Sequence, residues 1–186
     1  MENLQHALVI GGTGMLQKTC LWLADNNYMV TVINRHKNHF EQMVAKSKAP
    51  AHFHNLLVDY HDEEKLEKKL KQTFDLNGPP QLVISWIHSS APQALPLIID
   101  TICRYTNKWQ LIHIQGSSSF FVKEQINIPK DCTYQQVYLG FVMDEKGSRW
   151  LTNDEISNGV LKAMKLDHPK VVVGTLEPWH QRPSSS

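Results

Sequence analysis

Three glycines near the start of the chain have the type and spacing that could hold a phosphate group. Gly11, Gly12 and Gly14 separate the apolar run 7–10 from a segment, 15–25, whose apolar residues recur at helical spacing. Glycine at a strand-to-helix turn lets the chain turn sharply and lets a diphosphate approach the backbone, and the following helix offers free N–H groups. A tight turn without a ligand is the alternative. The pattern predicts a dinucleotide site formed by Gly11, Gly12, Thr13, Gly14, Met15 and Leu16.

The glycine pattern lacks its usual third member, because Gln17 stands three residues after Gly14. That third glycine normally allows close packing of the helix against the strand. Its absence predicts either a slightly displaced helix or a Gln17 side chain that reaches outward. The glycines expected to face the phosphates are unaffected.

The residues after the second expected strand, 28–33, bear on which dinucleotide binds. An acidic residue at this place would hold a ribose 2′-hydroxyl, whereas a basic residue accommodates a 2′-phosphate. The sequence has no carboxylate here and instead reads Asn34, Arg35, His36 and Lys37. Because a guanidinium group binds phosphate through two parallel hydrogen bonds, Arg35 favours NADP over NAD. A solvated arginine on a loop is the alternative.

Segments typical of strands and helices alternate along the chain, which predicts an α/β fold of the doubly wound (Rossmann) type. We expect a mostly parallel sheet of about seven strands, with helices on both faces and a ligand crevice at the carboxyl ends of the strands. The expected strands are 7–10, 28–33, 53–58, 81–86, 109–114, 134–143 and 171–173. The expected helices are 15–25, 38–48, one within 61–77, 91–105 and one that begins after Thr152.

Length and composition indicate one globular domain, 1–186, with a tail from about 178 that we expect to fray. The 19 basic and 18 acidic residues give a net charge of +1, which argues against nucleic acid or an anionic membrane as a partner. No apolar run approaches the roughly 20 residues of a membrane helix, and 1–3 lack the basic start of a signal peptide. The 3 cysteines and 10 histidines show no metal-ligand spacing. We therefore expect a cytoplasmic protein without a metal site.

With these residues in view, the chain resembles the short-chain dehydrogenase/reductase superfamily, in its atypical NADP-binding branch. The resemblance covers residues 4–119 and begins with the glycine turn. It implies that Asp59, with Tyr60 beside it, contacts the adenine. It also implies that four residues at the end of the fourth strand lie near the nicotinamide ribose: Ser85, Trp86, Ile87 and His88. At the end of the fifth strand, Ser117 or Ser118 matches the catalytic serine.

The chain departs from that superfamily at its catalytic pair, a Tyr-x-x-x-Lys motif on a long helix between strands five and six. Only 115–133 span this gap here, without helical periodicity. The nearest imitation is Tyr134 with Tyr138, in a segment that is better interpreted as a strand, where both would share one face. Lys123 or Lys130 could replace the missing lysine from the loop. A tyrosine without a nearby cation keeps a pKa of about 10 and is a poor proton shuttle at neutral pH.

Two functions remain open on this basis. The first is an atypical NADP(H)-dependent oxidoreductase acting on a small carbonyl compound, with Ser117, Ser118 and His88 as candidate catalytic residues. The second is a non-catalytic NADP(H) binder that acts as a sensor or regulatory pseudo-enzyme. The missing helix would also leave the apolar helix 91–105 without a neighbour, which predicts a homodimer through that helix.

Overall fold

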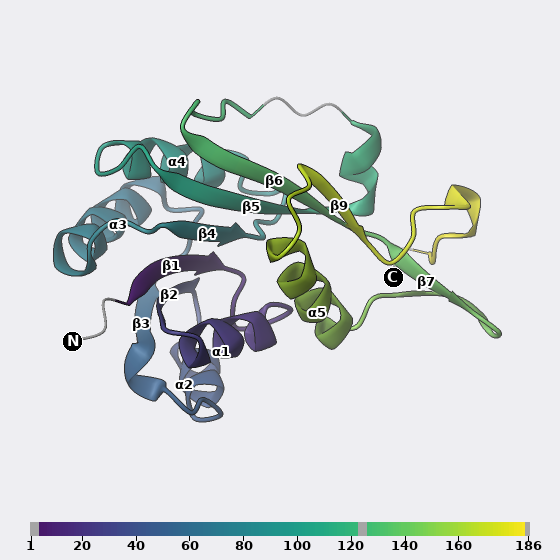
Figure 1. Ribbon diagram of the computed structural model, residues 1–186, viewed down its shortest axis with the longest axis horizontal. Helices are drawn as coiled ribbons and strands as arrows, with labels where there is room; N and C mark the ends of the chain where they lie inside the picture. Colours follow the sequence, from purple (N-terminus) through teal and green to yellow (C-terminus); the bar gives the residue numbers. More distant parts are fainter. Residues whose placement is uncertain (1–3, 123–125, 185–186) are drawn as a thin grey trace.

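A parallel sheet of seven strands forms the centre of the computed structural model, which describes residues 4–122 and 126–184. The strand order is β3-β2-β1-β4-β5-β6-β9, and every neighbouring pair is parallel (Figure 1). The strands are β1 (Gln5–Ile10), β2 (Tyr28–Asn34), β3 (Phe53–Leu57), β4 (Leu82–Ser85), β5 (Trp109–Gly116), β6 (Cys132–Leu139) and β9 (Lys170–Val173). The chain moves outward from β1 to β3 and then returns to β4, so the order reverses between β1 and β4. Such a switch point opens a crevice at the carboxyl ends of the strands.

Helices cover both faces of this sheet, as Figure 1 shows. One face carries α1 (Gln17–Asp25), α2 (Lys37–Val44) and α5 (Asn153–Met164), and the other carries α3 (Glu63–Asn77) and α4 (Ala94–Cys103). A hydrophobic core lies on each face of the sheet, and alternate residues of β1 pack into one or the other. Ala7 and Val9 pack on the α1 side, and Leu8 and Ile10 pack on the α3 side. The predicted doubly wound α/β fold is confirmed.

Side-chain caps fix the starts of two helices, whereas α4 begins at Ala94 without a side-chain cap. The Asp62 carboxylate accepts a hydrogen bond from the backbone N–H of Lys65 at the start of α3. At α5, Thr152 and Glu155 form a reciprocal capping box. Each cap satisfies N–H groups that have no partner within the helix, so each fixes where its helix begins.

The strand expected over 134–143 was wrong in one respect, because it is two strands. The chain leaves the central sheet after Leu139, and β7 (Phe141–Asp144) pairs antiparallel with β8 (Gly147–Trp150) in a hairpin that projects from the body (Figure 1). The break occurs at Gly140, where a Cβ atom would overlap the backbone carbonyl of Thr175. Phe141 and Thr175 exchange two backbone hydrogen bonds of 2.9 Å, which hold this close approach.

A partly buried histidine on β5 should make the stability of the fold sensitive to acid. The Nδ1 atom of His113 lies 2.9 Å from the hydroxyl of Tyr134 on β6, and burial lowers the pKa of His113 to about 4 from its usual 6.5. Because the unfolded chain binds this proton more readily, stability is full above pH 6.5 and is lost as the pH falls towards 4.

We expect His113→Gln to lose less stability on acidification than the wild-type protein. Between pH 7 and pH 4.5 the difference should be about 2 kcal/mol, from the pKa difference between the folded and unfolded states. Urea unfolding curves at both pH values measure it. An equal loss in both proteins would contradict a neutral, partly buried His113.

Candidate nucleotide site and adjoining cavity

The turn between β1 and α1 has the geometry of an anion site. Gly11 has φ 86°, a left-handed conformation that glycine adopts without strain, and the N–H of Gly14 donates to its carbonyl over 3.4 Å. No side chain caps α1 at Leu16, and the first turn of the helix contains no acidic residue. The positive end of α1 therefore lacks a neutralising side chain, which suits a bound phosphate group.

Two glycines of the turn have different roles. A Cβ atom at Gly12 would lie 2.7 Å from Cys20 Sγ and 2.9 Å from a methyl group of Val32, so Gly12 provides close packing of α1 on the sheet. A Cβ atom at Gly14 would meet no heavy atom of the described chain within 4 Å. Gly14 thus faces open space, whereas Gly12 does the packing expected of the missing third glycine.

The side chain at the third glycine position reaches outward, one of the two predicted arrangements. Gln17 Oε1 accepts a hydrogen bond of 3.0 Å from Lys46 Nζ, just beyond α2. The Gln17 side chain therefore lies beside α2. It stays out of the contact between α1 and β2, where Gly12 allows close packing.

The end of β2 carries one buried and three exposed polar residues. The amide nitrogen of Asn34 donates to Asn55 over 2.7 Å, and its oxygen is buried without a hydrogen-bond partner among the described residues. Arg35, His36 and Lys37 are exposed. The Asn34 oxygen has almost no accessible surface, so it would reach a ligand only after the Asn34 side chain moves, and the cofactor contact of Asn34 stays a prediction.

Arg35 is the residue predicted to bind the 2′-phosphate, and it forms an ion pair within the chain. Its guanidinium lies 3.7 Å from a carboxylate oxygen of Asp59 on the loop after β3, and both side chains are about half exposed. An exposed pair at this distance contributes about 0–1 kcal/mol. A phosphate group can therefore compete with Asp59 for Arg35 at little cost.

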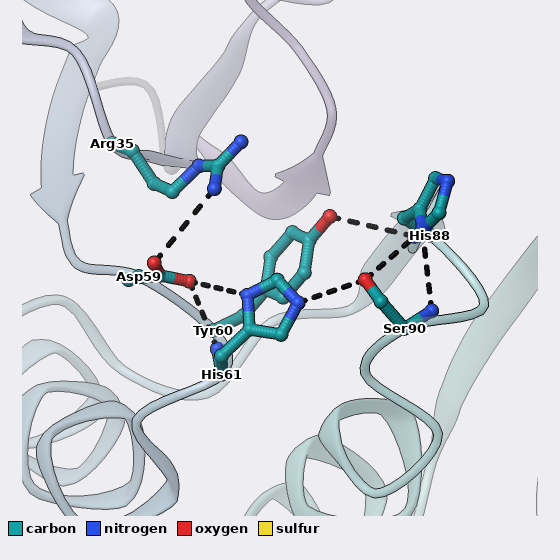
Figure 2. A network of polar contacts seen from close by, with 6 residues as sticks. All are labelled: Arg35, Asp59, Tyr60, His61, His88 and Ser90. Atoms are coloured by element: carbon teal, nitrogen blue, oxygen red, sulfur yellow. Dashed lines mark hydrogen bonds and ion pairs between the residues drawn. The ribbon is translucent and has the colours of Figure 1, made fainter.

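A chain of hydrogen bonds joins the loops after β3 and β4 (Figure 2). Asp59 contacts His61 Nδ1 at 2.6 Å, and His61 Nε2 contacts the Ser90 hydroxyl at 2.9 Å. Ser90 also lies 2.9 Å from His88 Nδ1, and the backbone N–H of His88 donates to the Tyr60 hydroxyl over 3.4 Å. The adenine residues implied by the resemblance, Asp59 and Tyr60, thus belong to one network with His88.

Hydrogen bonds hold Asp59 in its charged form. The backbone and side chain of His61 lower the pKa of this carboxyl most, and the charge of Arg35 lowers it further. The sequence assigned no site role to His61 or Ser90, because the hydrogen bond between them joins residues 29 positions apart. The carboxylate therefore stays ionised at neutral pH beside the arginine.

The four residues at the end of β4 point to different places. The Ser85 hydroxyl is buried without a hydrogen-bond partner in the described chain. Trp86 lines a cavity, Ile87 packs in the core beside α3 and α4, and His88 joins the Asp59 network. His88 is not among the residues that line the cavity, so its catalytic role stays a prediction.

A cavity of about 600 Å³ opens at the carboxyl ends of the strands. It brings together four of the predicted site residues: Met15, Trp86, Ser117 and Ser118. It also contains residues that sequence reasoning missed, from β8, α5 and the tail: Trp150, Asn153, Ile156, Trp179 and Arg182. A Cβ atom at Gly11 would lie 3.2 Å from the Trp86 carbonyl, so the turn and the cavity adjoin.

Comparison with known proteins gives a fold match without a sequence match. No protein-family model matches the sequence, and no match was found among curated proteins. The structure is similar to an actinorhodin polyketide ketoreductase with NADPH, with TM-score 0.68 and 10% identity over 95% of this chain and 98% of that one. It is also similar to an alcohol dehydrogenase from the archaeon Thermococcus sibiricus complexed with 5-hydroxy-NADP, with TM-score 0.70 and 14% identity over 98% and 100%.

A third similar structure, from Brucella melitensis, is described as a short-chain dehydrogenase/reductase of the glucose/ribitol dehydrogenase type. Its TM-score is 0.67, with 10% identity over 92% of this chain and 94% of that one. The chain has a Rossmann-like α/β fold similar to that of these structures. At such identities the likeness establishes the architecture alone.

The connection between β5 and β6 has no α-helix in the part that the structure describes. That connection contains a 3-10 helix, η2 (Ser117–Phe121). Tyr134 and Tyr138 share one face of β6, opposite the face of the cavity-lining Leu139, and the Tyr138 ring packs 5.1 Å from that of Phe120. Lys130 precedes β6, at the amino end of the sheet and away from the cavity. Lys123 lies outside the described residues.

The described chain shows little support for two further kinds of site. Among residues 4–122 and 126–184, no three His, Cys, Asp or Glu side chains gather as metal ligands, and no helix there is long and apolar enough to cross a bilayer.

The apolar side of α4 is buried within the chain, and the exposed large apolar side chains of the described residues lie elsewhere. Homodimer formation through this helix stays a prediction, which light scattering at micromolar concentration tests.

Proposed function

We propose that the protein binds NADP(H) and acts as an atypical oxidoreductase on a small carbonyl compound. The observation that carries this proposal is that the glycine turn adjoins the cavity. Met15 belongs to the turn and lines the cavity, and Gly11 packs against Trp86, which lines it too. A dinucleotide whose diphosphate lies at Gly14 therefore has its nicotinamide end beside Ser117 and Ser118.

The residues present fit such a cofactor at each of its parts. Open space at Gly14 and the uncapped start of α1 suit the diphosphate. Arg35, which is half exposed and only weakly paired with Asp59, suits a 2′-phosphate. Two of the structurally similar proteins are described with NADPH and with 5-hydroxy-NADP, which supports the same ligand class here.

Bound nicotinamide supplies hydride chemistry, and the chain supplies binding and orientation. Ser117 is buried and Ser118 exposed where both line the cavity. A serine hydroxyl there can donate a hydrogen bond to a substrate carbonyl oxygen, and it stabilises the charge that develops on this oxygen during reduction.

A second function, a non-catalytic NADP(H) sensor, is favoured by a specific observation. The tyrosines nearest to the superfamily's catalytic position, Tyr134 and Tyr138, lie on the face of β6 opposite the cavity. No lysine among the described residues lines that cavity. Such a protein would bind the nucleotide at the same turn without turnover.

NADPH oxidation across a panel of small aldehydes and ketones separates the two functions. For an enzyme, we expect Ser118→Ala to lower kcat/KM by about 100-fold or more, from the loss of a donor to the carbonyl oxygen, with NADPH affinity unchanged. Ser119→Ala is the matched control, because Ser119 does not line the cavity. NADPH binding without turnover of any carbonyl compound would favour the sensor.

A further inference from the structure

The walls of the cavity are unusually aromatic. Trp86 follows β4, Trp150 ends β8, and Trp179 begins the 3-10 helix η3 (Trp179–Gln181) in the tail. Three indole rings from separate elements thus surround one space, together with the aliphatic side chains of Leu139 and Ile156. Flat apolar walls of this kind favour a ligand with a flat apolar body.

Arg182 is the charged residue among those that line the cavity in the described chain, and no carboxylate accompanies it there. Its guanidinium lies 4.5 Å from the centre of the Trp179 ring, and its Nη1 donates to the Trp179 backbone carbonyl over 3.1 Å. Stacking and this hydrogen bond orient the guanidinium before any ligand arrives, while leaving most of its N–H donors available.

The other three arginines of the chain are neutralised internally. Arg35 pairs with Asp59, Arg104 with Glu67, and Arg149 with Glu155. Arg182 has no carboxylate within ion-pair distance among residues 4–122 and 126–184. The cavity therefore combines apolar rings with one oriented and unpaired positive charge.

We propose that the substrate is an aromatic carbonyl compound that also bears a carboxylate, and that Arg182 binds this carboxylate. The carbonyl part rests on the proposed function, which places the reacting group at Ser117 and Ser118. The carboxylate sits apart from it, at the mouth of the cavity beside Trp179. Reduction transfers a hydride from NADPH to the carbonyl carbon and a proton from water to its oxygen, giving an alcohol and NADP⁺.

Matched ligands that differ only in charge test the inference by binding. We would titrate the protein with 4-carboxybenzaldehyde and with its methyl ester, with and without NADP⁺, and follow the fluorescence of the cavity tryptophans. The acid should bind at least about 10-fold more tightly than the ester, as expected for a charge-assisted hydrogen-bond pair. Arg182→Gln should remove this difference and leave ester binding unchanged.

Two further variants sharpen the result. Arg182→Lys keeps the charge without the planar fork, so it should retain part of the preference for the acid. Arg104→Gln removes an arginine just after α4, outside the cavity, and should bind both ligands as the wild-type protein does. Unchanged ester binding in Arg182→Gln shows that the cavity is still folded.

The two proposals fail in distinguishable ways. Equal binding of acid and ester by the wild-type protein, or an acid preference that survives in Arg182→Gln, overturns the carboxylate site even when NADPH binds. If instead NADPH does not bind but the acid preference depends on Arg182, the carboxylate site stands and the oxidoreductase proposal is wrong.

Discussion

Gly14→Val should abolish NADPH binding without lowering the thermal stability of the protein. In the described chain nothing lies within 4 Å of a Cβ atom at this position, so we expect the valine side chain to be accommodated and to occupy the space proposed for the diphosphate. We expect at least a 100-fold loss of affinity, about 2.7 kcal/mol. NADPH fluorescence titration and thermal unfolding, on the same sample, measure the two effects.

Gly12→Ala is the matched control in the same turn and should do the reverse. Its methyl group would lie 2.7 Å from Cys20 Sγ and 2.9 Å from Val32, inside a packed core. Overpacking of this kind costs about 1–3 kcal/mol, so the melting temperature should fall. If Gly14→Val were the unstable variant and Gly12→Ala the stable one, the roles assigned to the two glycines would be wrong.

Arg35→Gln should weaken NADPH binding by about 10-fold to 100-fold and leave NADH binding nearly unchanged. The lost contacts are charge-assisted hydrogen bonds to the 2′-phosphate, which NADH lacks. Calorimetric titration with both nucleotides gives the ratio of affinities. Equal weakening of NADPH and NADH would mean that Arg35 supports the fold of the loop and does not read the phosphate.

Asp59→Asn should raise the affinity for NADPH relative to that for NADH, which is the opposite of the change expected for Arg35→Gln. Asp59 is the internal partner of Arg35 at 3.7 Å, and its negative charge also repels a nearby phosphate. Removing this charge frees the guanidinium, while an amide oxygen can still accept a hydrogen bond from adenine. The preference for NADPH over NADH should therefore rise a few-fold, in keeping with the small strength of exposed ion pairs.

The central sheet could be predicted because its signals are local. Each of these signals lies within a few consecutive residues: the apolar run of β1, the glycine turn after it and the capping box at Thr152. The break at Gly140 could not, since it depends on a backbone contact with Thr175, far along the chain. A strand pattern does not reveal such a contact.

Some residues of the candidate site could likewise be predicted from local signals in the sequence, and others could not. Met15, Trp86 and Ser118 follow strand ends, and the carboxyl ends of parallel strands lie at one edge of the sheet, so their meeting was foreseeable. Trp179 and Arg182 come from a Pro-rich tail without periodicity. The stacking of Phe121 on Trp179, with ring centres 4.7 Å apart, brings this tail to the cavity, and no sequence pattern encodes it.

Calorimetric titration of the folded wild-type protein with NADPH tests the central claim most directly, namely that the turn at Gly14 and the guanidinium of Arg35 together hold a phosphorylated dinucleotide. The account predicts saturable binding of one NADPH per chain, tighter than that of NADH. A flat titration with both nucleotides, or tighter binding of NADH, would contradict it.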